Sequence, residues 1–183
     1  MSAVAAEFAG RLAALGPIDV AGRAPRLRSG FTAVGVDALI VSAPANIRYL
    51  TGFTGSAGVV IVTAEELVLV TDGRYRDQAA DQINRSGAQA RIEISSTAQR
   101  ELIVSAVGNA QQIGLEADHI TWSSQRRYAT DWFADRSLVP TTGLVETLRR
   151  EKEPMELERI ELAAAIADAA LDLMRPRLLE RPT

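Results

Sequence analysis

The sequence contains no cysteine and only one histidine, His119, among its 183 residues. The lack of cysteine excludes disulfides and thiolate chemistry. A metal centre needs several converging His, Cys, Asp or Glu ligands, and His119 has only Glu116 and Asp118 close by in the sequence. A Ser-His-acid triad would have to use the same histidine, and no serine lies in a Gly-x-Ser-x-Gly turn. We therefore interpret His119 as structural or solvent-facing.

Strong net charge and long apolar runs are also missing. A formal net charge of −3 gives no general attraction to nucleic acid or to an anionic membrane. No apolar run approaches the roughly 20 residues that cross a bilayer, and the first 16 residues lack the basic start of a signal peptide. We expect no nucleic-acid partner, no membrane partner and a cytoplasmic location.

The informative stretch is residues 37–80, which holds three short apolar runs rich in Val and Ile at 38–41, 59–62 and 67–70. β-branched residues favour strands. Continuous apolar runs without polar alternation are typical of strands buried on both faces of a sheet. Only four residues separate the second run from the third, which predicts an antiparallel hairpin.

The remaining pattern alternates helices with strands. Further strands are predicted at 90–94, 112–116 and 138–140, and helices at 1–22 (ending near Gly16), 24–35, 72–84, 97–107 and 121–135. Gly35 is expected to end the second helix, Asp72 and Thr97 are expected to cap theirs, and Asn46 to cap a short turn at 47–50. This alternation predicts an α/β domain with a mixed sheet flanked by helices.

The last part of the chain has a different character. A short helix is expected at 143–150, and Pro154 is expected to open a long helix to about Arg175. Polar residues occupy one face of that long helix, and most of the rest is apolar. Either the apolar surface packs back on the domain, or a second domain or subunit covers it. We divide the chain into an N-terminal helix or tail (1–22), a domain (23–142) and linker helices (143–183).

Two segments are candidates for function, the loop at 49–58 and the sequence Thr-Asp-Gly-Arg-Tyr at 71–75. The glycines of the loop only superficially resemble a phosphate loop, because the Gly-x-Gly-x-x-Gly spacing and a Lys-Ser/Thr pair are missing. Residues 71–75 could be only a capped helix start, with Arg74 paired to Asp72 or Asp77. Alternatively, Arg74 and Tyr75 could serve binding or assembly. The residues alone form no complete catalytic site.

Four segments in order resemble the N-terminal domain of the creatinase/Xaa-Pro aminopeptidase/prolidase family, and its bacterial Xaa-Pro peptidase branch above all. They are VDALIVS at 36–42, NIRYLTGFTGS at 46–56, TDGRY at 71–75, and Leu148-Arg-x-x-Lys152-x-x-x-Glu156-Leu157 before a long helix. The resemblance covers about residues 23–183. It implies a creatinase N-terminal domain-like fold (Rossmann-like or ribonuclease H-like), followed by a long linker helix that leads to a catalytic domain.

In that family two divalent metal ions, usually manganese, are held by two Asp, one His and two Glu of the C-terminal domain, and no residue of this chain matches them. The resemblance therefore implies the assembly and substrate-gating domain of a dinuclear-metal Xaa-Pro peptidase (aminopeptidase P or prolidase-like). The chain itself is expected to hold no cofactor and to be inactive. Its expected partners are its own catalytic domain, a second subunit in a homodimer, and short proline-containing peptides.

The resemblance also suggests which residues meet a neighbouring subunit's substrate: Phe53, Thr54 and Ser56, with Arg74 and Tyr75 as weaker candidates. A glycine-flanked loop can place an aromatic ring and hydroxyls at an interface. Phe53 could pack on a prolyl ring, or it could be a core residue. Two other hypotheses stay open: a stand-alone, non-catalytic binding or dimerisation module of the same fold, and an enzyme complete in itself.

Overall fold

The structure, a computed structural model, describes residues 3–179 and divides into two compact units. One unit comprises residues 19–151. The other comprises the two ends of the chain, up to Ile18 and from Lys152 onward. The short helix that sequence analysis groups with the linker thus belongs to the same unit as the sheet.

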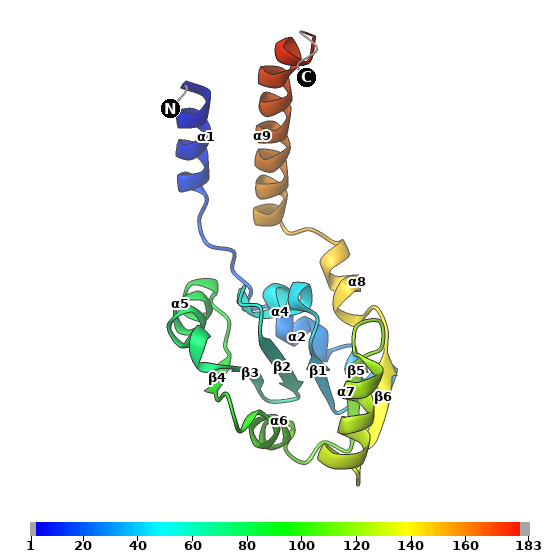
Figure 1. The fold of residues 1–183 in the computed structure, drawn as a ribbon. Helices are drawn as coiled ribbons and strands as arrows, with labels where there is room; N and C mark the ends of the chain where they lie inside the picture. The colour runs from blue at the N-terminus through cyan, green and yellow to red at the C-terminus, as the bar shows by residue number, and fades with distance from the viewer. Residues whose placement is uncertain (1–2, 180–183) are drawn as a thin grey trace. The chain divides into compact units, whose positions relative to one another are not determined.

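A mixed six-stranded sheet forms the centre of the first unit, with the strand order β4-β3-β2-β1-β5-β6 (Figure 1). β2 runs antiparallel to its neighbours β1 and β3, whereas the other neighbouring pairs are parallel. The mixed sheet and the β2–β3 hairpin are both confirmed. The strands are β1 (Ala38–Val41), β2 (Gly58–Thr63), β3 (Leu67–Thr71), β4 (Arg91–Ile94), β5 (Gln112–Glu116) and β6 (Ser137–Thr141).

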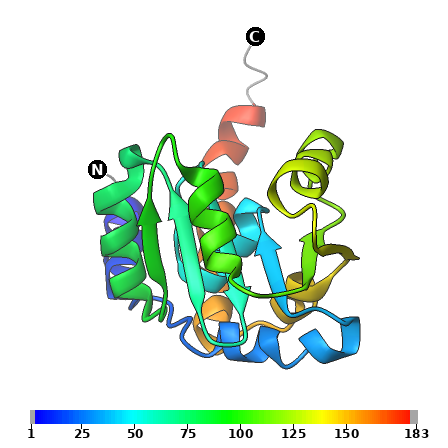
Figure 2. The same ribbon diagram turned by 90° about the horizontal axis from the view of Figure 1, so that it is seen from below.

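Helices cover both faces of this sheet (Figures 1 and 2). Strands β1 and β3 and the middle of β2 (residues 60–62) are buried, which is why their apolar runs do not alternate with polar residues. On one face, Ile40 and Ile61 pack with Ile103 of α6 and with Phe133. The helices of this unit are α2 (Arg23–Arg28), α3 (Phe31–Val34), α4 (Pro44–Thr51), α5 (Arg76–Ser86), α6 (Gln99–Val107), α7 (Trp122–Arg127) and α8 (Leu144–Arg150), with a 3₁₀ turn η1 (Gly73–Tyr75) and a π-helical turn η2 (Tyr128–Trp132).

Three expected helices are interrupted, and the one expected at 72–84 divides into η1 and α5. The helix expected at 24–35 is divided into α2 and α3 at Gly30, whose N–H donates to the Leu27 carbonyl and closes a turn. Gly35 ends α3 with a left-handed φ of 68°, as expected. The helix expected at 121–135 becomes η2 after Arg127, because the Phe133 N–H bonds to the Tyr128 carbonyl five residues earlier. This brings the two rings into contact in the core.

Two of the expected caps are wrong. Ala98, not Thr97, precedes α6, and the Ser95 hydroxyl accepts hydrogen bonds from the Thr97 and Ala98 N–H groups instead. Asn46 lies inside α4, since that helix already begins at Pro44. The Asp72 cap is confirmed for the 3₁₀ turn η1: its carboxylate accepts a hydrogen bond from the Arg74 N–H at 3.0 Å. The helix expected at 72–84 itself begins only at Arg76, after this turn.

The end unit contains two helices, α1 (Ala3–Ala14) and α9 (Pro154–Leu179). α1 ends before Gly16, and Arg159 of α9 donates a hydrogen bond to the Gly16 carbonyl. α9 begins at Pro154 as expected and continues beyond Arg175. Its large apolar side chains that remain 46–60% exposed are Leu157, Ile160, Leu171, Leu173 and Met174. Between residues 3 and 179, neither α9 nor any other helix is both long and apolar enough to cross a membrane.

Candidate functional site

The carboxyl ends of β1, β3 and β5 meet at one edge of the sheet, because these strands run in the same direction. β2 runs the opposite way, so the loop that precedes it, residues 52–57, lies at that same edge. In open α/β sheets, ligands bind outside the carboxyl ends of the strands. This edge carries both candidate segments, the glycine loop and residues 72–75.

The shape of the glycine loop is set by two close approaches. Gly52 has φ +76°, and a Cβ there would lie 2.6 Å from Ser86 Cβ, so both backbone and space require glycine. A Cβ on Gly55 would lie 2.2 Å from the Phe53 ring, so the loop folds directly over that ring. Thr51 steadies the start of the loop, since its hydroxyl accepts a hydrogen bond from the Phe53 N–H at 3.1 Å.

Phe53 is a core residue in this structure, the second of the two alternatives left open by its sequence. Only 1% of its surface is exposed. Its ring meets the Tyr75 ring edge-on, with the ring centroids 5.6 Å apart and an interplanar angle of 88°. Phe53 therefore supports Tyr75 from below and does not itself form the surface of the edge.

Thr54 is held by two glutamines that sequence analysis missed. Gln82 accepts a hydrogen bond from the Thr54 N–H at 2.9 Å and donates to the Thr54 hydroxyl at 2.8 Å. Gln78 donates to the same hydroxyl at 3.1 Å. The signal that could have revealed them is their spacing, since residues four apart share one face of α5. The Thr54 hydroxyl is thus engaged by its own domain.

Ser56 and Tyr75 form a hydroxyl pair with their oxygens 2.7 Å apart. They come from opposite sides of the β2–β3 hairpin, one before β2 and the other after β3. The hydrogen bond with Ser56 is the main cause that holds the pKa of Tyr75 below its ordinary value of 10.0. Among the candidate residues suggested by the sequence, Ser56, Arg74 and Tyr75 lie together in the structure.

Arg74 pairs with Asp72 and not with Asp77. Its Nε and Nη2 donate to the two oxygens of Asp72 at 3.0 and 2.8 Å, a forked arrangement. The hydrogen bond to Arg74 holds the pKa of Asp72 below 3.8, and Asp72 in turn raises the pKa of Arg74. The Arg74 side chain is 72% exposed, and its Cζ lies 5.4 Å from the centre of the Tyr75 ring. The guanidinium is therefore fixed in direction but open to solvent.

A second polar cluster lies at the carboxyl end of β5. The Glu116 carboxylate accepts hydrogen bonds from the Ser42 and Ala43 N–H groups at 2.6 and 2.7 Å, and from Asn46 Nδ2 at 2.7 Å. It thereby satisfies the start of α4 in place of a local cap. Arg149 donates to Asn46 Oδ1 at 2.9 Å, which ties α8 to α4. This network could not be predicted from the sequence, because its members lie far apart in the chain.

These residues do not fit a metal centre. Glu116, Asp118, His119 and Glu146 line one small cavity, yet within residues 3–179 no group of three or more His, Asp or Glu side chains is placed to hold a metal ion. Glu116 is already occupied by three N–H donors.

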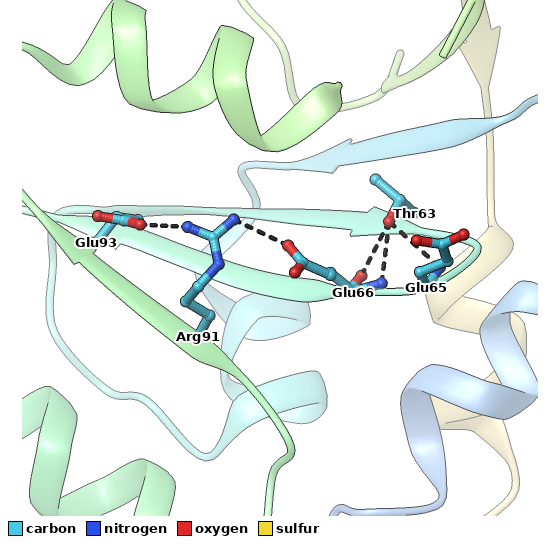
Figure 3. Close-up of polar contacts among 5 residues, drawn as sticks. All are labelled: Thr63, Glu65, Glu66, Arg91 and Glu93. Carbon is cyan, nitrogen blue, oxygen red and sulfur yellow. Dashed lines mark hydrogen bonds and ion pairs between the residues drawn. The ribbon is translucent and has the colours of Figure 1, made fainter. Parts of the chain in front are cut away.

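The amino end of β3 carries a different set of charges (Figure 3). Arg91 donates through Nη2 to Glu66 at 2.9 Å and through Nη1 to Glu93. The Thr63 hydroxyl accepts hydrogen bonds from the Glu65 and Glu66 N–H groups at 3.4 and 3.0 Å and closes the hairpin turn. Both ends of the guanidinium thus have carboxylate partners.

Comparison with known proteins identifies the family. Residues 23–150 match the sequence model of the Creatinase/Prolidase N-terminal domain. The chain belongs to this family.

Its similarity to individual proteins extends beyond that domain. It is 32% identical over 159 residues to an uncharacterised peptidase, YqhT, of Bacillus subtilis, covering 85% of this chain and 44% of that protein. An Xaa-Pro dipeptidase from Bacillus anthracis is similar in structure, with a TM-score of 0.79 and 31% identity, covering 86% of this chain and 43% of the other. The chain therefore spans less than half the length of both these relatives.

A further solved structure is an N-terminal domain by itself. The N-terminal domain of the cytoplasmic peptidase PepQ from Mycobacterium tuberculosis shares 33% identity with this chain at a TM-score of 0.61, covering 69% of this chain and 98% of the other. The mixed sheet with flanking helices is thus the fold of the creatinase/prolidase N-terminal domain.

Proposed function

We propose that this chain is the N-terminal assembly and substrate-gating domain of a dinuclear-metal Xaa-Pro peptidase, of the aminopeptidase P or prolidase kind. The observation that carries the proposal is that the chain matches the N-terminal domain and covers only 43–44% of two peptidase relatives. In the complete protein a C-terminal domain would hold two divalent metal ions, manganese by family resemblance, whose chemistry would be to activate water and to polarise the scissile carbonyl. The 183-residue chain alone is inactive.

The gating role falls to the carboxyl edge of the sheet. Thr54, Ser56, Arg74 and Tyr75 lie there, and in a homodimer they face the substrate bound by the neighbouring subunit. Phe53, included among these candidates from sequence, acts through Tyr75, whose ring it supports. The substrates are short proline-containing peptides, and the protein is cytoplasmic.

The uncovered apolar side chains of α9 support the same proposal. Leu157, Ile160, Leu171 and Met174 recur at helical spacing and remain 46–60% exposed. We assign this surface to contact with the protein's own catalytic domain. Covering it removes these side chains from water and stabilises the complete protein.

The experiment is to read the source DNA beyond the Thr183 codon and to express the complete frame. We expect the frame to continue into a domain with two Asp, one His and two Glu in metal-binding order. The complete protein should then hydrolyse an Xaa-Pro peptide with manganese, and the 183-residue chain should not. Hydrolysis by the 183-residue chain itself would contradict the proposal.

One alternative has an observation in its favour. Residues 19–151 form a compact unit with its own buried core, which is consistent with a stand-alone, non-catalytic binding or dimerisation module. A stop codon directly after Thr183 would favour this alternative over a peptidase domain.

A further inference from the structure

We infer that Arg74, Tyr75 and Ser56 form a binding site for the carboxylate group of a short peptide. The inference rests on the proposed function for its biological meaning, but the site itself is argued from the geometry of this chain. Such a site needs hydrogen-bond donors that point away from the domain and are held in a fixed orientation. It also needs a chemical reason to prefer a carboxylate.

The outward donors come from two groups. The Arg74 guanidinium uses Nε and Nη2 for Asp72, and its Nη1 makes no hydrogen bond to any part of the chain that the structure describes. Ser56 and Tyr75 carry two hydroxyl protons, but only one of them can lie between the two oxygens. The second proton is therefore directed elsewhere. Nη1 and one hydroxyl together offer N–H and O–H donors to a ligand.

The orientation of these donors is fixed by their neighbours. The fork from Asp72 holds the plane of the guanidinium, and the Tyr75 ring lies against it with 5.4 Å between Arg74 Cζ and the ring centre. Phe53 holds the Tyr75 ring in turn. A site whose donors are already in position loses little conformational freedom on binding.

The preference for a carboxylate follows from a second arginine in the same chain. Arg91 binds two carboxylates at once, Glu66 through Nη2 and Glu93 through Nη1 (Figure 3). Arg74 has only one carboxylate partner, Asp72, which accepts hydrogen bonds from Nε and Nη2. The place that Glu93 fills on Arg91 is open on Arg74, and a ligand carboxylate can occupy it with charge-assisted hydrogen bonds.

This site specifies a class of substrate. Under the proposed function, Arg74 narrows the approach to the catalytic centre of a neighbouring subunit, and we propose that a short peptide places its amino end in that centre and its carboxylate on Arg74. The complete protein should therefore prefer short peptides with a free carboxyl terminus over amidated or longer ones.

The test is an NMR titration of the isotope-labelled 183-residue chain with Gly-Pro-Gly, its C-terminal amide, sodium acetate and inorganic phosphate. We expect the free acid and acetate to shift the signals of Ser56, Arg74 and Tyr75, including Arg74 Nε. The amide should bind at least about tenfold more weakly, because it lacks the charge. Arg74→Gln should abolish the shifts, whereas Arg91→Gln should leave them unchanged.

Several outcomes would overturn the inference. Equal shifts with the acid and the amide would mean that the peptide backbone is recognised, and stronger binding of phosphate would indicate a general anion site. No shift with any probe, or unchanged binding in a folded Arg74→Gln variant, would also remove it. Because no hydrolysis is measured, such failures leave the peptidase proposal to its own test.

Discussion

Two arginines near opposite ends of β3, Arg91 at the start of the neighbouring β4 and Arg74 after the end of β3, differ in how many of their partners the domain supplies. At the amino end, Arg91 has a carboxylate on each side, and the Thr63 hydroxyl serves two N–H groups of the turn. At the carboxyl end, Arg74 is fixed by one carboxylate and remains 72% exposed beside a hydroxyl pair. An arginine with all its partners supplied by its own domain is structural. An arginine held in place with donors left over is a candidate for binding.

The largest expected effect comes from removing the support of the carboxyl end. Phe53→Ala deletes a fully buried ring and leaves a cavity beneath Tyr75. We expect a loss of about 3–5 kcal/mol in the free energy of unfolding, measured by urea denaturation. The burial of Phe53 makes a folding defect the first consequence, as expected for the core position and not for direct packing on a prolyl ring.

The matched control for Phe53→Ala is Glu65→Ala in the exposed turn at the amino end, which should change the unfolding free energy by less than about 0.5 kcal/mol. If the unfolding free energy of Phe53→Ala lies within about 1 kcal/mol of that of the parent protein, the result would contradict the buried position of the ring.

The next effect concerns the backbone of the glycine loop. Gly52→Ala adds a left-handed strain of about 1–2 kcal/mol and forces a Cβ against Ser86, which lies 2.6 Å away. Gly35→Ala is the control, because Gly35 has a similar φ of +68° and nothing within 4 Å of the added Cβ. We expect Gly52→Ala to be more destabilising in urea by at least about 1 kcal/mol. Equal losses of unfolding free energy in the two variants would show that the loop accommodates the added Cβ at Gly52 without further cost.

A smaller effect is expected at the amino end. Thr63→Ala removes the hydroxyl that accepts two turn N–H groups, which should cost about 1 kcal/mol of unfolding free energy. Thr63→Ser keeps the hydroxyl and should behave like the parent protein. If Ser destabilises as much as Ala, the methyl group and not the hydroxyl holds the turn.

The smallest effect is expected for Arg91→Gln. Both of its ion pairs are exposed to solvent, so the unfolding free energy should fall by less than about 1 kcal/mol, and by less still at high salt. A loss well above that value, insensitive to salt, would mean that Arg91 supports the edge of the sheet through packing.

Much of the fold could be predicted from sequence because its signals are local. Continuous Val/Ile runs predicted β1, β2 and β3, and the four-residue gap between the second and third runs predicted the hairpin. Asp72 and Gly35 were recognised because a cap and a left-handed glycine depend on adjacent residues.

The predictions that were wrong concern contacts between residues far apart in the chain, or neighbouring residues that compete for the same hydrogen bonds. Asn46 looked like a cap, but its amide bonds Glu116, 70 residues away. Thr97 looked like a cap, but the Ser95 hydroxyl binds the Thr97 and Ala98 N–H groups, and α6 begins after Ala98. For the candidate site, the family resemblance suggested Ser56, Arg74 and Tyr75 together with Phe53 and Thr54, and their role toward substrate stays a prediction. The contacts of Gln78 and Gln82 could not be predicted, because they depend on how the loop docks on α5.

The most direct measurement is KM for a short Xaa-Pro peptide in the complete protein, compared between Arg74→Gln and Arg91→Gln. A lost charge-assisted contact should raise KM about tenfold or more in Arg74→Gln, with folding unchanged, and Arg91→Gln should match the parent protein. Equal KM values in the two variants would contradict a substrate-facing role for the carboxyl end of β3.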